Sequence, residues 1–567
     1  MTCADLSAPL TAPARQRDWL PWIVGGLTIL ILVVFMIYPI LKTVLGAFVR
    51  QGDPLDLAHA TLFNFERFFV AATYKSALKN SVLVSVLATI VATILALPAA
   101  YAVSRIRMPF RNVILALSVI PLIAPPFIGA YSWVILLGRS DIVTHYALEW
   151  FGITLPPTYG LFGVVLALSL SFFPYVFLIV QGALAAGDPF IEESAHVMGA
   201  SRWRILRTIT LPLVTPAIAA AAMIVFIKAL GNFGVPAILG GEMYALPTLI
   251  YFQVHGFFNL NGAAAIAFVN VLITLLAILL LPRINRRRRF VTVTGVTRRA
   301  PQMTGLGPRL FANIYVWGLL VLTLVPQIIV VWSSFAERWA GTLFPARYGL
   351  ANYREVFGDL LQPILNSMML AGAATAMAVV FGTLLAYTSV RRRFVGKWAL
   401  DLTVMLPFVL PGIVTGVAFL ATFNDGLLVL TGGDTILVLA YFVRRIAYVF
   451  RSVSASIAQV DPKIEEASTV CGATWGRTMG KVTVPLIAPG ILAGAIIVFA
   501  TLISEMSVTI LLYSASWKTI AIAIFERLTG DQMPEAAAIG AVTIGLTLVL
   551  VFAASRLIGR SMADMFR

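Results

Sequence analysis

Charged residues and cysteines are both scarce in this sequence, and each shortage excludes a class of protein. Only 12% of the 567 residues are charged, while 60% are hydrophobic; a soluble domain is roughly half apolar and about one quarter charged. The hydrophobic core of a water-soluble protein stops growing at about 250–300 residues. A chain that is this long and this apolar is therefore not a soluble protein. The two cysteines, Cys3 and Cys471, are too few and too far apart for a disulfide framework or a zinc site. The composition predicts a polytopic membrane protein.

Long apolar runs occupy about half of the chain and predict membrane-spanning helices, each of which needs roughly 20 residues. The runs are continuous rather than alternating, which favours helices over a β-barrel, the other structure that satisfies its backbone in lipid. The expected fold is therefore an all-α polytopic membrane protein with about twelve transmembrane helices. They are Pro21–Phe48, Asn80–Tyr101, Val113–Leu137, Leu161–Gln181, Pro216–Leu239, Ala263–Leu281, Phe311–Ser333, Asn366–Tyr387, Trp398–Thr422, Thr435–Val453, Pro489–Tyr513 and Ala536–Leu557.

The net charge of +16 would suggest nucleic acid in a soluble protein. In a membrane protein the positive-inside rule explains it, so we expect contact with lipid and no nucleic-acid partner. The arginine-rich segment 283–310 follows the sixth helix and is predicted to be a cytoplasmic linker. Residues 1–20 are then a cytoplasmic tail, the first apolar run is an uncleaved anchor, and both termini lie on the cytoplasmic side.

The two halves of the chain, residues 21–282 and 311–567, form an internal repeat. Asn80-Ser81 matches Asn366-Ser367 at an offset of 286, and further along the offset becomes 273. At the second offset, Asp188–Ile218 and Asp461–Ile491 are identical at 14 of 31 positions. Six helices per unit is an even number, so both units enter the membrane the same way round. This predicts two parallel six-helix repeats with a pathway between them.

The best-repeated stretch lies in a cytoplasmic loop between the fourth and fifth helices of each half. In each copy an aspartate, Asp188 or Asp461, can cap a short helix, with proline at its first position and acidic residues in its first turn. A glycine then ends that helix by a left-handed turn, and a second helix leads to the proline that opens the next span. The pattern predicts a helical hairpin that protrudes from the membrane twice.

This pattern resembles the EAA loop of binding-protein-dependent ABC importer permeases: Glu-Ala-Ala, three residues, Gly, nine residues, Ile-x-Leu-Pro. The stretches Glu193–Pro212 and Glu466–Pro485 keep the spacing, with Ser replacing one Ala in each copy and Val replacing Ile and Leu in the second. The resemblance implies that these hairpins dock onto the ATPase subunit. The expected coupling residues are Glu192, Glu193, Ala195, Gly199, Pro212, Glu465, Glu466, Ala467, Gly472 and Pro485.

The resemblance further implies the ABC type I importer permease fold in a bacterial inner membrane, with two copies of an ATPase subunit and a periplasmic solute-binding protein as partners. ATP and magnesium would be bound by the ATPase, and no cofactor is expected on this chain. Gly480-Lys481 comes nearest to a phosphate-binding loop, but Trp475 stands in place of its first glycine and Val482 in place of its hydroxyl residue. We therefore expect a transport subunit that is not itself an enzyme.

For the cargo, two fused halves are typical of the ferric-iron importer branch, and the stretches Lys228–Gly240 and Ser504–Leu512 look like the fifth helices of those permeases. Fused permeases for thiamine and for 2-aminoethylphosphonate share much of this pattern, so those cargoes stay open. An ion-gradient-driven secondary transporter is the alternative of another class. It would share the parallel repeat but would not need two docking hairpins.

Polar residues within the predicted helices are candidates for the translocation pathway, because each is costly in a bilayer. They are Lys228, Asn232, Arg444, Arg445 and Glu505. Lys228 and Asn232 are spaced to share a face of the fifth helix, and Glu505 reaches the depth of the two arginines. An ion pair there would act as a gate or substrate contact, or would only fix helix packing. Histidines are too scattered for a metal motif, and no catalytic constellation is present.

Overall fold

The computed structural model describes residues 20–138, 142–187, 189–285, 305–339, 343–358, 360–392, 397–426 and 428–558. Within these ranges the chain is helical apart from its loops and one two-stranded antiparallel hairpin, which confirms the predicted all-α class. The predicted capping residue Asp188, nearly all of the tail 1–20 and the greater part of the linker 283–310 lie outside the described residues.

The first half contains helices of very different lengths, and the long ones overlap its predicted spans. They are α1 (Leu20–Leu32), η1 (Val33–Ile37), α2 (Tyr38–Ala47), η2 (Leu57–His59), α3 (Phe63–Val70), α4 (Ala72–Arg105), α5 (Arg111–Leu117), α6 (Ile120–Ile123), α7 (Pro126–Leu137), α8 (Ile142–Phe151), α9 (Leu161–Ala186), α10 (Pro189–Val197), α11 (Arg202–Ile205), η3 (Leu206–Thr210), α12 (Leu211–Leu230), α13 (Gly234–Leu239), α14 (Leu246–His255) and α15 (Leu260–Asn285).

The second half repeats this order and adds the short strands. Its elements are α16 (Leu306–Ser333), β1 (Ala336–Arg338), β2 (Arg347–Tyr348), α17 (Ala351–Phe357), α18 (Leu361–Arg391), α19 (Lys397–Val409), α20 (Gly412–Phe423), α21 (Asp434–Ala458), α22 (Pro462–Val470), α23 (Trp475–Thr478), η4 (Met479–Thr483), α24 (Val484–Ile503), α25 (Thr509–Leu512), η5 (Ala515–Trp517), α26 (Ile520–Thr529) and α27 (Met533–Ile558).

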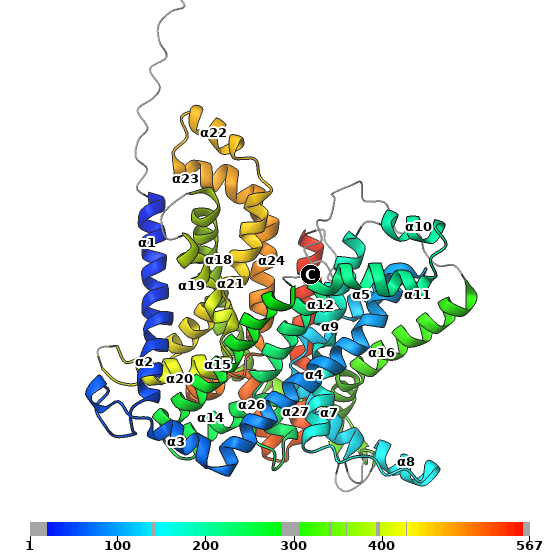
Figure 1. Ribbon diagram of the computed structural model, residues 1–567. Helices are drawn as coiled ribbons and strands as arrows, with labels where there is room; N and C mark the ends of the chain where they lie inside the picture. The colour runs from blue at the N-terminus through cyan, green and yellow to red at the C-terminus, as the bar shows by residue number, and fades with distance from the viewer. Residues whose placement is uncertain are drawn as a thin grey trace, which may run out of the picture.

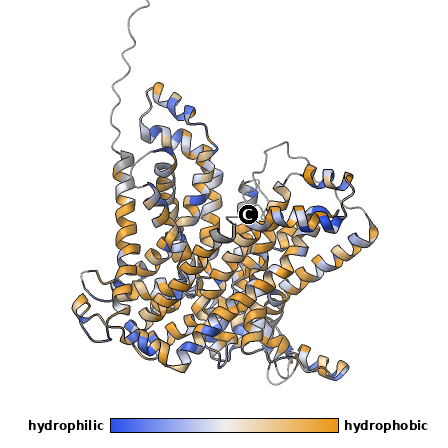
Figure 2. Ribbon diagram, viewed as in Figure 1, coloured by the Kyte–Doolittle hydropathy of each residue, from blue (hydrophilic) through white to orange (hydrophobic). Residues whose placement is uncertain are grey.

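Among the described residues, nine helices are long and apolar enough to cross a membrane, or up to eleven if each of two bent pairs is one span. The remaining predicted span is α21, which is 25 residues long. It fails that composition test because it carries Arg444, Arg445 and Arg451. An apolar band runs across the molecule between more hydrophilic ends (Figure 2), as expected for a polytopic membrane protein.

Four predicted continuous helices are broken, which corrects the sequence-based spans. Val113–Leu137 and Trp398–Thr422 bend by 94° and 102° at their breaks, where Pro125 and Pro411 precede α7 and α20. Proline lacks the N–H that a continuing helix needs and clashes with the preceding turn. The predicted spans Pro216–Leu239 and Pro489–Tyr513 stop early, at Leu230 and Ile503, for a reason given below.

Within each half, small residues let the long helices approach closely. Helix α4, which packs against α9 and α12, buries Ala88, Ala92 and Ala96, which are spaced four apart and hence lie on one side of the helix. Gly382 does the same in α18, where a Cβ would lie 3.0 Å from the Cβ of Val449 on α21. Lipid tails are as apolar as side chains, so such close backbone packing is what holds membrane helices together.

The first helix of each half packs against the other half. Helices α1 and α2 lie beside α18 and α20, and α16 lies against α4 and α7 (Figure 1). Lys42 on α2 pairs with Asp425 after α20 at 3.3 Å. Tyr315 on α16 donates a hydrogen bond to the Leu95 carbonyl at 2.9 Å. The two halves therefore clasp one another, an exchange that the division of the sequence at 283–310 did not predict.

Equivalent residues of the two halves make equivalent hydrogen bonds. Ser81 Oγ accepts from the Leu246 N–H at 2.7 Å, and Ser367 Oγ accepts from the Ile520 N–H at 2.8 Å, at the starts of α14 and α26. The helical pairs α10–α11 and α22–α23 lie at the same end of the molecule (Figure 1). Both observations agree with a parallel repeat.

Candidate functional site

The predicted hairpins form in both halves, and the first glutamate of each acidic pair fastens its hairpin to a membrane helix. Glu192 on α10 receives two 2.9 Å hydrogen bonds from the Arg105 guanidinium at the end of α4. Glu465 on α22 pairs with Arg391 on α18 at 3.1 Å. Both pairs are largely buried, with side chains 6% to 17% exposed. Each carboxylate also accepts a hydrogen bond from a hydroxyl group, that of Thr210 in the first half and that of Tyr387 in the second.

The second glutamate of each pair takes no part in these buried ion pairs, Arg105–Glu192 and Arg391–Glu465, which we call the latches. Glu193 is half-buried and Glu466 is exposed, and neither forms an ion pair within the described residues. Ala195 is buried, whereas Ala467 is exposed. In the second hairpin, Ser468 and Thr478 are hydrogen-bonded at 2.9 Å and hold its two helices together. Thus Glu193 and Glu466 are available to a partner, while Glu192 and Glu465 are structural supports.

A left-handed glycine makes each hairpin turn, as the sequence predicted. Gly199 has φ +87° and Gly472 has φ +83°, and a Cβ at either position would have nothing within 4 Å. Glycine is favoured there by its backbone conformation and not by lack of space. Beside these turns, the side chains of Val197, Met198 and Val470 are 80% to 87% exposed. The tips of the hairpins are therefore apolar and uncovered.

The helix after each turn continues straight into the membrane segment. The runs Arg202–Leu230 and Trp475–Ile503 are each 29 residues long, or about 43 Å at ~1.5 Å per residue. Both pass a π-helical turn directly before their proline, where Leu211 N–H bonds Leu206 O and Val484 N–H bonds Met479 O. This wider turn lets Pro212 and Pro485 stand inside a long helix. The sequence had predicted two separate helices at this point.

These two long helices end at one cavity, of ≈ 190 Å³, between the halves. Its walls are formed by the breaks after α12 and α24, by the starts of α7 and α20, and by α9 and α21. All five candidate pathway residues line it: Lys228, Asn232, Arg444, Arg445 and Glu505. Residues that lie far apart in the sequence thus meet at one place. From the sequence, we predicted such a meeting only for Glu505 and the two arginines.

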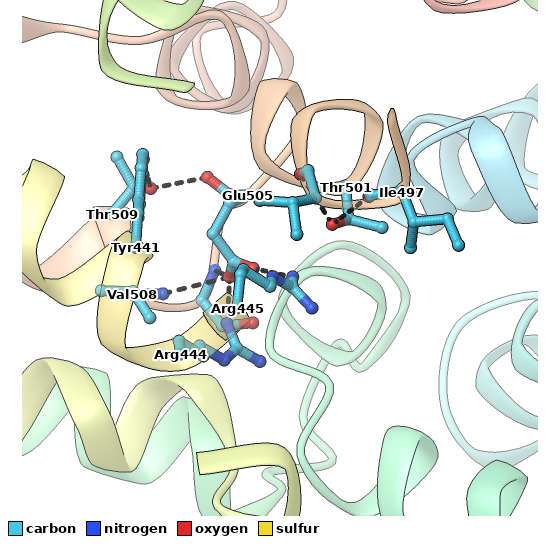
Figure 3. A network of polar contacts seen from close by, with 10 residues as sticks. Tyr441, Arg444, Arg445, Ile497, Thr501, Glu505, Val508 and Thr509 are labelled. Carbon is cyan, nitrogen blue, oxygen red and sulfur yellow. Dashed lines mark hydrogen bonds and ion pairs between the residues drawn. The ribbon is translucent and has the colours of Figure 1, made fainter. Parts of the chain in front are cut away.

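The predicted ion pair of Glu505 is present and involves both arginines (Figure 3). Arg444 Nη1 lies 2.6 Å from Glu505 Oε1, and Arg445 Nη2 lies 2.5 Å from Oε2. The Glu505 side chain is 5% exposed and the arginines are 16% and 10% exposed. A carboxylate this deeply buried is stable only when paired, so the cluster is a fixed part of the cavity wall.

Asn232 and Glu505 also explain why their helices stop early. Asn232 Oδ1 accepts from the Val235 N–H at 2.9 Å, and Glu505 Oε1 accepts from the N–H groups of Ser507 and Val508 at 3.1 and 3.4 Å. Side chains that bond to nearby backbone groups compete with helix continuation. The prediction that Lys228 and Asn232 share one helical face is therefore wrong, because α12 ends at Leu230, between the two residues.

Two pairs of residues important to these sites were not among the sequence candidates. Arg105 and Arg391 are the latch partners, and Tyr175 and Tyr448 line the cavity beside the cationic residues. Lys228 Nζ lies 5.2 Å from the Tyr175 ring centre, and the Arg445 guanidinium lies 5.7 Å from that of Tyr448. Both pairs recur at the repeat offsets of 286 and 273, which is the signal that identifies them.

Comparison with known proteins finds one family domain twice in the chain. The sequence model of the family described as "Binding-protein-dependent transport system inner membrane component" matches residues 88–290 and again 378–564. Each half therefore carries one copy of the family domain, and each copy includes one hairpin and one wall of the cavity.

Two relatives named as ferric transport permeases are similar over most of the chain, and a third relative is similar over less than half of it. The ferric transport system permease protein FbpB of Actinobacillus pleuropneumoniae is 28% identical over 464 residues, which is 80% of this chain and 67% of that protein. The putative ferric transport system permease protein FbpB 1 of Haemophilus influenzae is 30% identical over 508 residues, 87% of this chain and 78% of its own. The putative 2-aminoethylphosphonate transport system permease protein PhnV of Salmonella typhi is 27% identical over 246 residues, covering 42% of this chain and 92% of that protein.

Proposed function

This chain belongs to the family of binding-protein-dependent transport system inner membrane components, and we propose that it carries ferric iron across the membrane at the expense of ATP hydrolysed by a separate subunit. It is the fused permease of an ABC importer, with both family domains on one chain. Solute would be delivered by a periplasmic binding protein. Two copies of the ATPase, holding ATP and magnesium, would dock on the two hairpins.

The observation that carries this proposal is the continuous helix that joins each hairpin to the cavity. Both 29-residue rods begin at a docking hairpin and end at the wall that holds Asn232 or Glu505. A rigid helix transmits a displacement of one end to the other, so a movement of the hairpins changes the cavity directly. The latches Arg105–Glu192 and Arg391–Glu465 would make α4 and α18 follow the same movement.

The hairpin tips support an ATPase as the partner. They present exposed apolar side chains at one end of the molecule, twice, at pseudo-symmetric positions, and such patches mark interaction surfaces. A dimer of identical subunits meets both hairpins in the same way. The starts of α1 and of the hairpins lie at this end, as does the end of α27 (Figure 1), so both termini would be cytoplasmic.

Ferric iron is proposed as cargo because two relatives that align with at least 80% of this chain are named as ferric transport permeases. The relative named for 2-aminoethylphosphonate covers 42% of the chain, so that solute is the second candidate; thiamine is a further candidate for the same machine. An ion-gradient-driven transporter would have no use for paired docking hairpins.

Reconstitution tests the proposal. The permease, its ATPase and its binding protein are placed in liposomes, and uptake of ⁵⁵Fe(III) is followed with ATP inside or outside. We expect uptake that needs ATP on the hairpin side together with the binding protein. The paired change Glu193→Ala with Glu466→Ala should abolish it while leaving folding intact. Uptake driven by a proton or sodium gradient without ATP would contradict the proposed mechanism, and ATP-driven uptake of 2-aminoethylphosphonate alone would contradict iron.

A further inference from the structure

The cavity between the halves carries an excess of positive charge. Its lining residues within the described chain include three cationic side chains, Lys228, Arg444 and Arg445, against one carboxylate, Glu505. With the carboxylate shared by both arginines, two positive charges are left over.

Lys228 receives no compensation from this cluster. Among the residues that the structure describes, no carboxylate forms an ion pair with it, and its ammonium faces the ring of Tyr175. Arg445 is also incompletely satisfied, because its buried Nε has no hydrogen-bond partner in the described part of the chain. Unpaired charges in a low-dielectric site are costly, so a site of this kind favours an anion.

The backbone does not alter this balance. Two helices of twelve residues begin at the cavity, α7 and α20, and two of twenty end there, α12 and α24. Helix ends carry about +0.5 and −0.5 charge respectively, so their contributions offset. The side chains decide the sign of the potential.

The charges do not follow the repeat, whereas the rest of the cavity does. Tyr175 and Tyr448 are equivalent, as are Pro125 and Pro411. At the 273 offset, however, Lys228 corresponds to Thr501. In the same way Arg444 corresponds to Ser171 and Arg445 to Phe172. The charges are therefore not a feature that the two copies share by duplication. The Arg444 Nη1 atom even occupies space that only glycine leaves open, since a Cβ at Gly412 would lie 2.5 Å from it.

We infer that the cavity accepts an anionic cargo, so that ferric iron passes it as a complex enclosed by oxyanion ligands and not as a bare cation. This inference rests on the proposed function for the identity of the metal. Ferric iron prefers hard oxygen ligands, and the outer oxygens of a carboxylate or phosphate complex would face Lys228, Arg444 and Arg445. The electrostatic argument applies equally to an organic phosphonate.

The charge that moves per iron atom tests this directly. The complete transporter in liposomes receives ⁵⁵Fe(III) on its binding protein, with ¹⁴C-citrate in one arm and ³²P-phosphate in the other, and a potential-sensitive dye reports the charge transported. We expect one oxyanion to enter with iron in a fixed ratio, and zero or negative charge to move per iron. Three positive charges per iron, with neither oxyanion entering, would overturn the inference and leave ATP-driven iron import intact.

Variants locate the effect in the cavity. Lys228→Met should lower uptake by about tenfold or more, the effect of losing one hydrogen bond to a charged group, and Lys228→Arg should restore most of it, which separates charge from folding. Lys75→Met, which removes an exposed positive charge on α4 that does not line the cavity, should leave uptake unchanged. Full activity of Lys228→Met would overturn the inference. ATP-driven uptake of 2-aminoethylphosphonate without iron uptake would support an anionic cavity while refuting iron as the cargo.

Discussion

Asn232 and Glu505 occupy the same position in the two halves, and each accepts a hydrogen bond from the N–H of the valine three residues further on. One side chain is neutral and the other is charged. Only Glu505 therefore binds the arginines of α21, and the cavity between two similar halves becomes electrically asymmetric. The repeat supplies the architecture, and a few substitutions within it supply the chemistry.

Replacement of these two residues should separate the role that they share, the hydrogen bond to the backbone, from the ion pairs that only Glu505 forms. Asn232→Ala removes one hydrogen bond, from the Val235 N–H, and should lower the free energy of unfolding by about 1 kcal/mol. Glu505→Ala leaves two buried arginines without a partner and should cost about 3–5 kcal/mol. Denaturant titration of the purified proteins in detergent measures both. Equal losses would contradict a structural ion cluster at Glu505.

The latch between hairpin and membrane helix should behave as one coupled unit. In a double-mutant cycle of Arg105→Ala and Glu192→Ala, we expect a coupling free energy of about 1–2 kcal/mol, within the range for contacting residues. Either single change should also reduce ATPase activity stimulated by the binding protein. The exposed Arg107→Ala is the control and should change neither quantity. Additive effects of the two latch changes would show that the pair does not act together.

The hairpin turns should depend on glycine for their backbone conformation. Gly199→Ala and Gly472→Ala force an alanine into a left-handed conformation, which costs about 1–2 kcal/mol, and should weaken binding of the ATPase subunit. Gly476→Ala is the matched control, because nothing lies near its Cβ and its φ is not positive. Binding is measured by titrating the labelled ATPase subunit. A similar effect at Gly476 would mean that the turn conformation is not what matters.

The apolar hairpin tips should be required for docking and not for folding. Val197→Asp together with Val470→Asp places two charges on side chains that are 87% and 86% exposed, so stability should change by less than about 0.5 kcal/mol. The ATPase subunit should no longer co-purify. Val70→Asp, at a valine that is 75% exposed on α3 at the opposite end, should leave co-purification unchanged. Retention of the ATPase by the double variant would place its docking surface elsewhere.

The sequence by itself determined the membrane class, the repeat and the hairpins, because each depends on local properties. Hydrophobicity accumulates along a run, identity at a fixed offset is read directly, and the turn at Gly199 requires only its own backbone. It also brought Glu505 and the two arginines together, since depth in the bilayer follows from distance along a helix.

The tertiary structure decided which polar groups meet. Whether the helix continues past Leu230 depends on whether the Asn232 side chain accepts a hydrogen bond from the Val235 N–H. The apolar composition of this stretch does not predict that hydrogen bond. Glu192 and Glu193 are adjacent and chemically identical, yet only Glu192 reaches Arg105, because the folded chain places that side chain of α10 beside the end of α4. The exchange of α1 and α16 between the halves likewise arises from long-range packing. The position of Lys228 on the cavity wall without a carboxylate partner among the described residues, the basis for an anionic cargo, follows from those same distant contacts.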